Sequence, residues 1–230
     1  IAVGSTNGHV ILGGEYTMGQ TYGTETVTLT GSNLPTTAGG SGAGFDNQQP
    51  ALTVNWVINI FGDYPGPDGY IAPTSMGVVS QFAGNFEPNG TMFCDGRLLP
   101  IAEYDVLFAL LGTTYGGDGI TTFALPDLRG RTPIGAGNGY TPGLVVGNQT
   151  TTLTPSNLPV QMGGSGSAVS NFGPSLVMNA FITTQGIYPA RDRDFDGEEA
   201  TISEVFFFAG TNTTFRNALP TYGQLLSIAQ

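Results

Sequence analysis

Acidic residues are densest between Asp192 and Glu199, where Asp192, Asp194 and Asp196 alternate with other residues and a glycine follows. This pattern is typical of the start of a calcium loop, because alternate carboxylates converge on the ion and glycine permits a sharp turn. The twelfth position holds Ser203 instead of a bidentate glutamate. Two interpretations stay open: a loose Ca²⁺ site, or a solvated acidic loop with no ion. The candidate ligands are Asp192, Asp194, Asp196 and Glu199.

The remaining reactive side chains do not form a catalytic group. The chain has one histidine, His9, and one cysteine, Cys94, far apart in sequence. Such an isolated pair does not make a nucleophile with its base. Asp127 and Arg129 lie in a turn, where a carboxylate accepts backbone N–H bonds and pairs with a guanidinium group. We therefore expect no catalytic residue and no enzymatic activity.

The composition excludes several partner classes. The chain has 230 residues, a formal net charge of −11 and no lysine. Nucleic acid is excluded as a partner because its phosphates require clustered cations. No apolar run approaches the roughly 20 residues of a membrane span. Only 10% of residues are charged, against about 25% in average soluble domains, which favours an extracellular protein or one that buries surface in an assembly.

Short apolar and threonine-rich runs predict mainly β structure. The segments 52–61 and 176–184 have a period of two and are expected to be long strands. Residues 24–30 alternate threonine with apolar residues, as half-buried strands do. After Pro100, apolar residues recur at helical spacing until Gly112, which is placed to end a helix. The expected fold class is mainly β with a few short helices.

The stretch from Val78 to Gly137 resembles the phage tail collar family. The motifs that carry the resemblance are Phe82-Ala83-Gly84, Cys94-Asp95-Gly96, Leu99-Pro100-Ile101 and the run from Leu125 to Arg131, which reads LPDLRGR. The resemblance implies a structural or adhesive protein and names no catalytic residue. It also implies metal-binding histidines after an Asn-Leu-Pro motif, and these histidines are absent here.

The sequence contains an internal duplication. Residues 23–65 align without a gap with residues 147–189, and about half of the positions are identical. Such a match is not a chance event, and repeats of this kind decide the architecture of a chain. Upstream, Gly8–Gly14 aligns with Gly130–Ala136. We therefore expect two tandem collar-type β units.

The second unit is expected to be split between the chain ends. Residues 204–210 resemble residues 80–84, Leu219-Pro220 resembles Leu99-Pro100, and the segment from Tyr222 onwards repeats the helical spacing that follows Tyr104. The front half of the second collar block would then lie at the C-terminus and its back half at the N-terminus. The expected segments are 1–70 (first post-collar segment with an N-terminal strand), 71–143 (intact collar block), 144–190 (second post-collar segment) and 191–230 (acidic insert, partial collar block and donor-strand candidate).

The two halves of the split unit can meet within one chain, in a trimeric fibre, or between neighbouring subunits. An unpaired strand readily accepts a strand from a neighbour, and a head-to-tail contact that does not close a ring yields a filament. Three consecutive phenylalanines indicate a strand buried on both faces, as a donated strand would be. The expected interface residues are Ile1, Val3, Val10, Leu12, Val205, Phe206, Phe207, Phe208, Tyr222, Leu225, Leu226 and Ile228.

These observations give two hypotheses. The first is a non-enzymatic structural protein whose copies assemble head to tail into an extracellular filament by strand complementation. The alternative is a phage tail-fibre or contractile-injection-system component that binds cell-surface glycans. The expected location is accordingly a secreted filament, with Ile1 following a removed signal peptide, or a virion tail.

Overall fold

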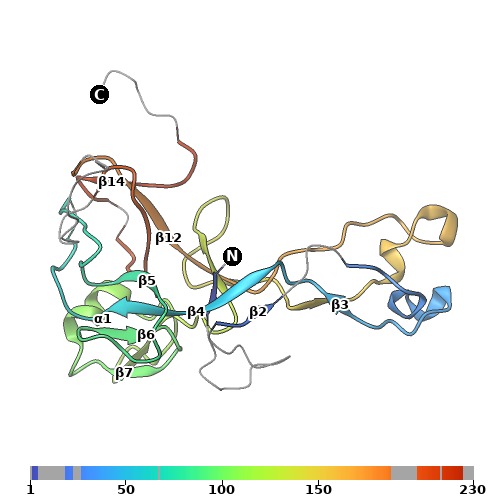
Figure 1. The fold of residues 1–230 in the computed structure, drawn as a ribbon, viewed down its shortest axis with the longest axis horizontal. Helices are drawn as coiled ribbons and strands as arrows, with labels where there is room; N and C mark the ends of the chain where they lie inside the picture. The colour runs from blue at the N-terminus through green and yellow to red at the C-terminus, as the bar shows by residue number, and fades with distance from the viewer. Residues whose placement is uncertain are drawn as a thin grey trace.

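The computed structural model describes residues 2–4, 19–22, 27–66, 68–187, 201–212 and 214–224. Within this part of the chain, strands dominate, and the single α-helix, α1 (Asp105–Leu111), is accompanied by short 3-10 turns. The expected fold class, mainly β with a few short helices, is confirmed. The molecule is elongated, with most strands at one end and two long arms at the other (Figure 1).

One mixed sheet runs through the molecule in the order β1-β4-β5-β13-β12-β10. Strands β2 and β6 also pair with β4, and β9 and β14 also pair with β12. The bounds are β1 (Ala2–Gly4), β2 (Thr21–Tyr22), β4 (Ala51–Asn59), β5 (Val78–Phe82), β6 (Thr91–Phe93), β9 (Thr132–Gly135), β10 (Val145–Val146), β12 (Ser175–Thr183), β13 (Val205–Phe208) and β14 (Ala218–Pro220).

The two nine-residue strands, β4 and β12, have the same set of partners. Each has one parallel neighbour, β1 or β9, and three antiparallel neighbours. The register also agrees: Asn55 faces Phe82, and the aligned Asn179 faces Phe208. We call β1, β2, β4, β5 and β6 the first strand set, and β9, β10, β12, β13 and β14 the second strand set. This agreement supports the prediction of an internal duplication.

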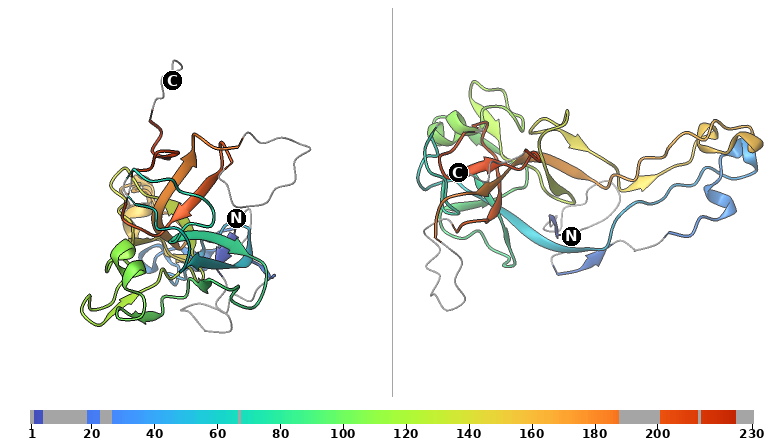
Figure 2. Two further views of the ribbon diagram at one scale, coloured as in Figure 1. Left: turned by 90° about the vertical axis from the view of Figure 1, so that its left-hand side faces the viewer. Right: turned by 90° about the horizontal axis from the view of Figure 1, so that it is seen from above.

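The two arms are also alike. Each contains a pair of 3-10 turns, η1 (Gly31–Asn33) with η2 (Thr36–Ala38), and η3 (Pro155–Asn157) with η4 (Val160–Met162). Thr30 and Thr154 form capping boxes at the starts of η1 and η3, each with the asparagine three residues later. Strand β3 (Phe45–Asp46) of one arm pairs with β11 (Thr150–Thr151) of the other, so the arms lie side by side (Figure 2).

The collar lobe, defined here as residues 103–131, packs against the sheet beside β6. It contains α1 and β8 (Thr122–Ala124), and β8 pairs with β7 (Leu98–Pro100). Helix α1 buries Leu107, Leu110 and Leu111 at the predicted helical spacing, and it ends at Gly112, whose N–H bonds the Phe108 carbonyl. The apolar face of the helix therefore holds the lobe on the sheet.

The structure corrects the alignment of the N-terminus. Ala2 faces Leu52, and Pro133 faces the aligned Leu176, so Ala2–Gly4 corresponds to Pro133–Gly135. The expected match of residues 8–14 with residues 130–136 is therefore wrong. The N-terminus supplies the strand that follows a collar block, and not the back half of the block. No counterpart of residues 103–131 lies among the residues that the structure describes, and completion of the second unit by the chain ends stays a prediction.

The alignment of the C-terminus is corrected in the same way. Leu219 pairs with Ile182 as Met92 pairs with Ile58, so β14 corresponds to β6 and not to β7. Thr221-Tyr222-Gly223 then corresponds to Cys94-Asp95-Gly96. In agreement, the N–H groups of Thr221 and Cys94 both bond carbonyls of aligned residues, Ala180 and Trp56.

Candidate functional site

The collar lobe covers the turn at Cys94 through main-chain hydrogen bonds. The Leu128 N–H donates to the Cys94 carbonyl at 2.9 Å, and the Gly96 N–H donates to the Pro126 carbonyl at 3.1 Å. The side chain of Leu128 is fully buried. The segment around Leu128 therefore pairs with this turn through an isolated β-bridge between Asp95 and Asp127, with the Leu128 side chain in the core.

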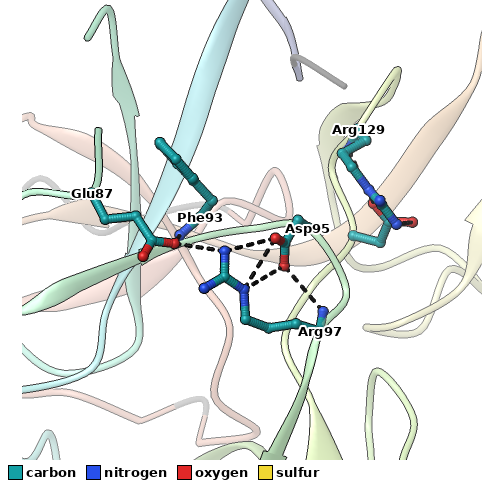
Figure 3. A network of polar contacts seen from close by, with 6 residues as sticks. Glu87, Phe93, Asp95, Arg97 and Arg129 are labelled. Carbon is teal, nitrogen blue, oxygen red and sulfur yellow. Dashed lines mark hydrogen bonds and ion pairs between the residues drawn. The ribbon is translucent and has the colours of Figure 1, made fainter. Parts of the chain in front are cut away.

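Ion pairs surround this contact. Arg97 bonds Asp95 at 2.7 Å and Glu87 at 2.6 Å (Figure 3). Asp127 bonds Arg129 at 2.8 Å and Arg131 at 2.9 Å. Burial opposes ionisation of Asp127, but hydrogen bonds from both arginines outweigh it and lower the pKa of this carboxyl group. One group of ion pairs lies outside the lobe and the other lies within it, and the second agrees with the structural role expected for Asp127 and Arg129.

The single cysteine is part of the core and not a reactive group. Cys94 is buried, and burial followed by the negative charge of Asp95 raises the pKa of its thiol well above the usual value. A thiol that stays protonated is a poor nucleophile. The expectation that no catalytic residue is present concerns His9 as well, which lies outside the described residues.

The collar lobe also covers a segment of the second strand set. The Thr211 N–H donates to the Leu110 carbonyl at 3.1 Å, and the Tyr115 hydroxyl donates to the Ala209 carbonyl at 3.1 Å. Phe208 and Ala209 are fully buried there. One lobe therefore joins the Cys94 turn of the first strand set to the Phe208 segment of the second.

The collar lobe does not cover the two surfaces that match these, which are the Phe82 segment of the first strand set and the Tyr222 turn of the second. Phe82 and Ala83 correspond to Phe208 and Ala209, yet Phe82 is half-buried and Ala83 is exposed. The Phe82 ring packs edge-on against Phe86 at 5.3 Å between ring centroids, and Phe86 is itself largely exposed. The Phe82–Phe86 pair therefore lies at the surface of the first strand set, whereas the matching Phe208 of the second strand set lies beneath the collar lobe.

A hollow of about 460 Å³ lies beside the turn that matches Cys94. We call it the Tyr222 cradle. It is lined by Gly135, Ala136, Gly137, Asn138, Tyr140, Ala180, Val205, Phe207, Thr221 and Tyr222. Val205 is 58% exposed in this cradle, whereas the matching Val79 is 2% exposed. The smaller Ala180 stands where the first strand set has Trp56, and no segment among the described residues covers Thr221 as the lobe covers Cys94.

The expected interface residues separate into three groups. Val205, Phe207 and Tyr222 line the cradle, whereas Phe206 and Phe208 are buried within their own chain. The third group lies outside the described residues or has an undescribed side chain: Ile1, Val3, Val10, Leu12, Leu225, Leu226 and Ile228.

The expected donation of the triple-phenylalanine strand to a neighbour is corrected by its place in the sheet. Strand β13 pairs with β12 on one side and with β5 on the other, both in its own chain. The predicted burial on both faces is also corrected. Phe206 and Phe208 are buried on one face, whereas Val205 is exposed and Phe207 is partly exposed on the other.

Sequence reasoning missed the cradle, although a signal for it exists. Once Tyr222 is matched with Asp95, residues 224–229 (QLLSIA) align with residues 97–102 (RLLPIA). This match places the turn at Tyr222, and not the helix after Tyr104, beside the cradle. The earlier alignment with the helix after Tyr104 hid that point.

The calcium prediction stays untested, because Asp192, Asp194, Asp196 and Glu199 lie outside the described residues. Among the residues that are described, no three histidine, cysteine, aspartate or glutamate side chains are grouped to hold a metal ion. The described part also contains no helix that is long and apolar enough to cross a membrane.

Residues 77–133 match the family model of the phage tail collar domain. This region contains the Cys94 turn and the collar lobe, so the resemblance noted from the motifs is confirmed. No curated protein and no solved structure matches the chain.

Proposed function

We propose, from the premise that residues 77–133 are a phage tail collar domain, that this protein is a structural subunit whose copies assemble head to tail by complementation. The domain is typical of structural phage-tail proteins and not of an enzyme family. The contact joins the surface around Tyr222 in one subunit to the N-terminal region of the next. The assembly is a filament, either secreted or part of a tail.

The observation that carries this proposal is the uneven cover of two matching surfaces. The Cys94 turn is covered by its own collar lobe, whereas the Tyr222 cradle exposes valine, phenylalanine and tyrosine side chains. Exposed apolar clusters of this kind mark interaction surfaces. A net charge of −11 would oppose association at low salt, so we expect assembly to increase with ionic strength.

Electron microscopy of the purified protein over a concentration series tests the proposal. Under head-to-tail assembly, fibres lengthen as concentration and salt rise, and a variant with Tyr222→Asp stays monomeric because the cradle then repels an apolar partner. Compact trimers of fixed size at every concentration would contradict the proposal.

A second candidate function is glycan binding at the base of the arms. A pocket there is lined by amide side chains and by Phe172, and Tyr140 lies 6.1 Å from that ring between centroids. Both rings are partly exposed, and an aromatic surface beside amides suits a sugar ring. A glycan array with the native chain and the Phe172→Ala variant tests it: signal on no glycan, or equal signal from both proteins, excludes this candidate.

A further inference from the structure

The segment between β1 and β2 carries an insertion that its counterpart lacks. Gly19 matches Gly143, because both have positive φ and donate their N–H groups to aligned carbonyls, those of Thr53 and Val177. Fourteen residues separate Gly4 from Gly19, whereas seven separate the matching Gly135 from Gly143. The first segment is therefore longer by seven residues.

The insertion is apolar and almost uncharged. Asn7-Gly8 matches Asn138-Gly139 and Tyr16-Thr17 matches Tyr140-Thr141, which leaves residues 9–15 (HVILGGE) as the added segment. Its centre is the aliphatic run Val10-Ile11-Leu12. An aliphatic run costs free energy in water unless it is buried, at about 25 cal/mol per Å² of apolar surface.

The Tyr222 cradle has the chemistry to bury such a segment. Its residues replace the polar and charged groups of the Cys94 turn: Tyr222 stands for Asp95, Gln224 for Arg97, and Phe207 for Gln81. The lobe segment that covers the Cys94 turn carries Asp127 and two arginines, which bond in an ionic network. A cradle without charges favours an occupant without charges.

The main chain of the cradle offers the same two hydrogen-bonding groups as the Cys94 turn. There, the carbonyl of Cys94 and the N–H of Gly96 bond the lobe segment. The matching carbonyl of Thr221 and N–H of Gly223 have no bonded partner among the residues that the structure describes. An extended segment with a free N–H and a free carbonyl would satisfy both.

We propose that the inserted segment Val10-Ile11-Leu12 of a second copy docks in the Tyr222 cradle as an added strand. This inference rests on the proposed head-to-tail assembly and names its contact. The occupant comes from a second copy because both anchors of the inserted segment, β1 and β2, pair with β4. The corresponding loop of the second strand set, residues 136–142, already lines the cradle of its own set.

Disulfide trapping tests the contact directly. One preparation of the full chain carries Ile11→Cys and the other carries Val205→Cys, and the two are mixed under mild oxidation. The native Cys94 is buried with a raised thiol pKa, so it does not compete. We expect a covalent heterodimer at least tenfold more abundant than with the control Ile120→Cys, which lies at an 83% exposed position away from the cradle.

The outcomes separate this inference from the assembly proposal. Fibres that form while the Ile11–Val205 pair crosslinks no more than the control would overturn the docking inference and leave head-to-tail assembly standing. A chain that carries both substitutions and closes its disulfide as a monomer in dilute solution would overturn the role of a second copy. Absence of both fibres and heterodimer would overturn both proposals.

A second pair of variants guards against misfolding. Val205→Asp is expected to raise the protein concentration needed for fibre growth at least tenfold, because a carboxylate in the cradle repels the aliphatic segment. Ile120→Asp is the matched control and should leave that concentration unchanged. Both variants should melt within a few degrees of the native chain, since both positions are exposed. Equal fibre growth by Val205→Asp and the native chain would contradict the docking.

Discussion

Phe208 in β13 and Phe82 in β5 occupy matching positions, because the two strands pair in the same register with β12 and β4. The surroundings of the two side chains differ. Each faces an aligned asparagine of the long neighbouring strand, and each is followed by alanine and glycine. Phe208 is fully buried beneath Leu110 and between the rings of Phe181 and Phe215. Phe82 has only Phe86 as an aromatic neighbour among the described residues, and it is half-buried.

The difference shows that the strand register of this motif and the burial of its phenylalanine have separate causes in this chain. The Phe-Ala-Gly motif and its asparagine fix the register of both strands. Burial of the motif depends on the collar lobe, which the sequence contains once. The motif at Phe82 therefore ends a folded strand whose surface is not covered by the lobe. A partner can bind to such a surface without disturbing the sheet.

The largest expected effect comes from truncating the two phenylalanines. Phe208→Ala should lower the free energy of unfolding by about 3–5 kcal/mol, because it empties a fully enclosed site. Phe82→Ala should cost about 1 kcal/mol, because water already reaches that ring. Urea unfolding of monomeric samples measures both. Similar losses for the two variants would mean that the lobe does not distinguish the two surfaces.

The matching asparagines should behave alike, in contrast to the phenylalanines. The Asn179 side chain donates to the Gly210 carbonyl at 2.9 Å, and the Asn55 side chain donates to the Gly84 carbonyl at 2.7 Å. Both side chains are 2% exposed. Replacement by alanine leaves the buried Gly210 carbonyl or the partly buried Gly84 carbonyl without its partner, so each variant should lose about 1–3 kcal/mol in urea unfolding.

If only Asn179→Ala lowered the free energy of unfolding, the hydrogen bond of Asn55 would contribute no stability in the absence of a covering lobe. The conservative control is Asn→Ser at both positions, which retains a shorter donor. We expect the serine variants to lie between the alanine variants and the native chain.

The sequence predicted the matched strands and the helix better than it predicted which surfaces the collar lobe buries. The alternation of apolar residues in segments 52–61 and 176–184 located β4 and β12, and the spacing of leucines after Pro100 located α1. Both signals are local. The sequence predicts the N-terminal match at residues 8–14, because glycine-rich stretches align without fixing a strand register. Only the pairing of Ala2 with Leu52 resolved it.

The candidate site depended on longer-range information. Three consecutive phenylalanines predict burial on both faces, but only the face of Phe206 and Phe208 is buried, while Val205 and Phe207 line the cradle. Val205 and Val79 have the same side chain at matching positions, and their exposure is set by their neighbours, Ala180 and Trp56 among them. No periodicity within one strand contains that information.

Low pH should destabilise the Cys94 turn, which the lobe covers, more than the matching Tyr222 turn. The pKa of Asp127 is lowered by its arginine partners in the folded state. Its contribution is therefore complete above the unfolded-state pKa of about 3.9 and is lost as pH falls below about 4 towards the folded-state value. Asp127→Asn should cost about 1–2 kcal/mol at neutral pH and flatten the acid side of the stability curve.

Thermal melts of the native chain and Asp127→Asn between pH 3 and pH 7 measure this effect. The control is Asp46→Asn, at an exposed carboxylate in β3 that makes no ion pair among the described residues. A variant curve parallel to the native curve throughout that range would show that the Asp127 pairs do not contribute to acid sensitivity.

The smallest expected effect concerns the turns that enter β5 and β13. Gly77 and Ser203 match, because each has a positive φ, 83° and 69°, and each donates its N–H to an aligned carbonyl, that of Asn59 or Thr183. A side chain on Gly77 would meet Leu110 at 2.7 Å beneath the collar lobe, whereas Ser203 is exposed. The turn before β13 therefore tolerates serine where the turn before β5 requires glycine.

Serine at a positive φ is still strained, since left-handed backbone costs about 1–2 kcal/mol for a residue with a Cβ atom. Ser203→Gly should remove that strain and give a net gain of about 0.5–1 kcal/mol, because the added freedom of the unfolded chain offsets part of it. Ser203→Ala keeps the Cβ atom and should leave stability unchanged in the same urea experiment. If alanine and glycine stabilised equally, the hydroxyl group and not the backbone would be the source of strain. The match between the two turns would then hold for their hydrogen bonds but not for the energetics of their backbones.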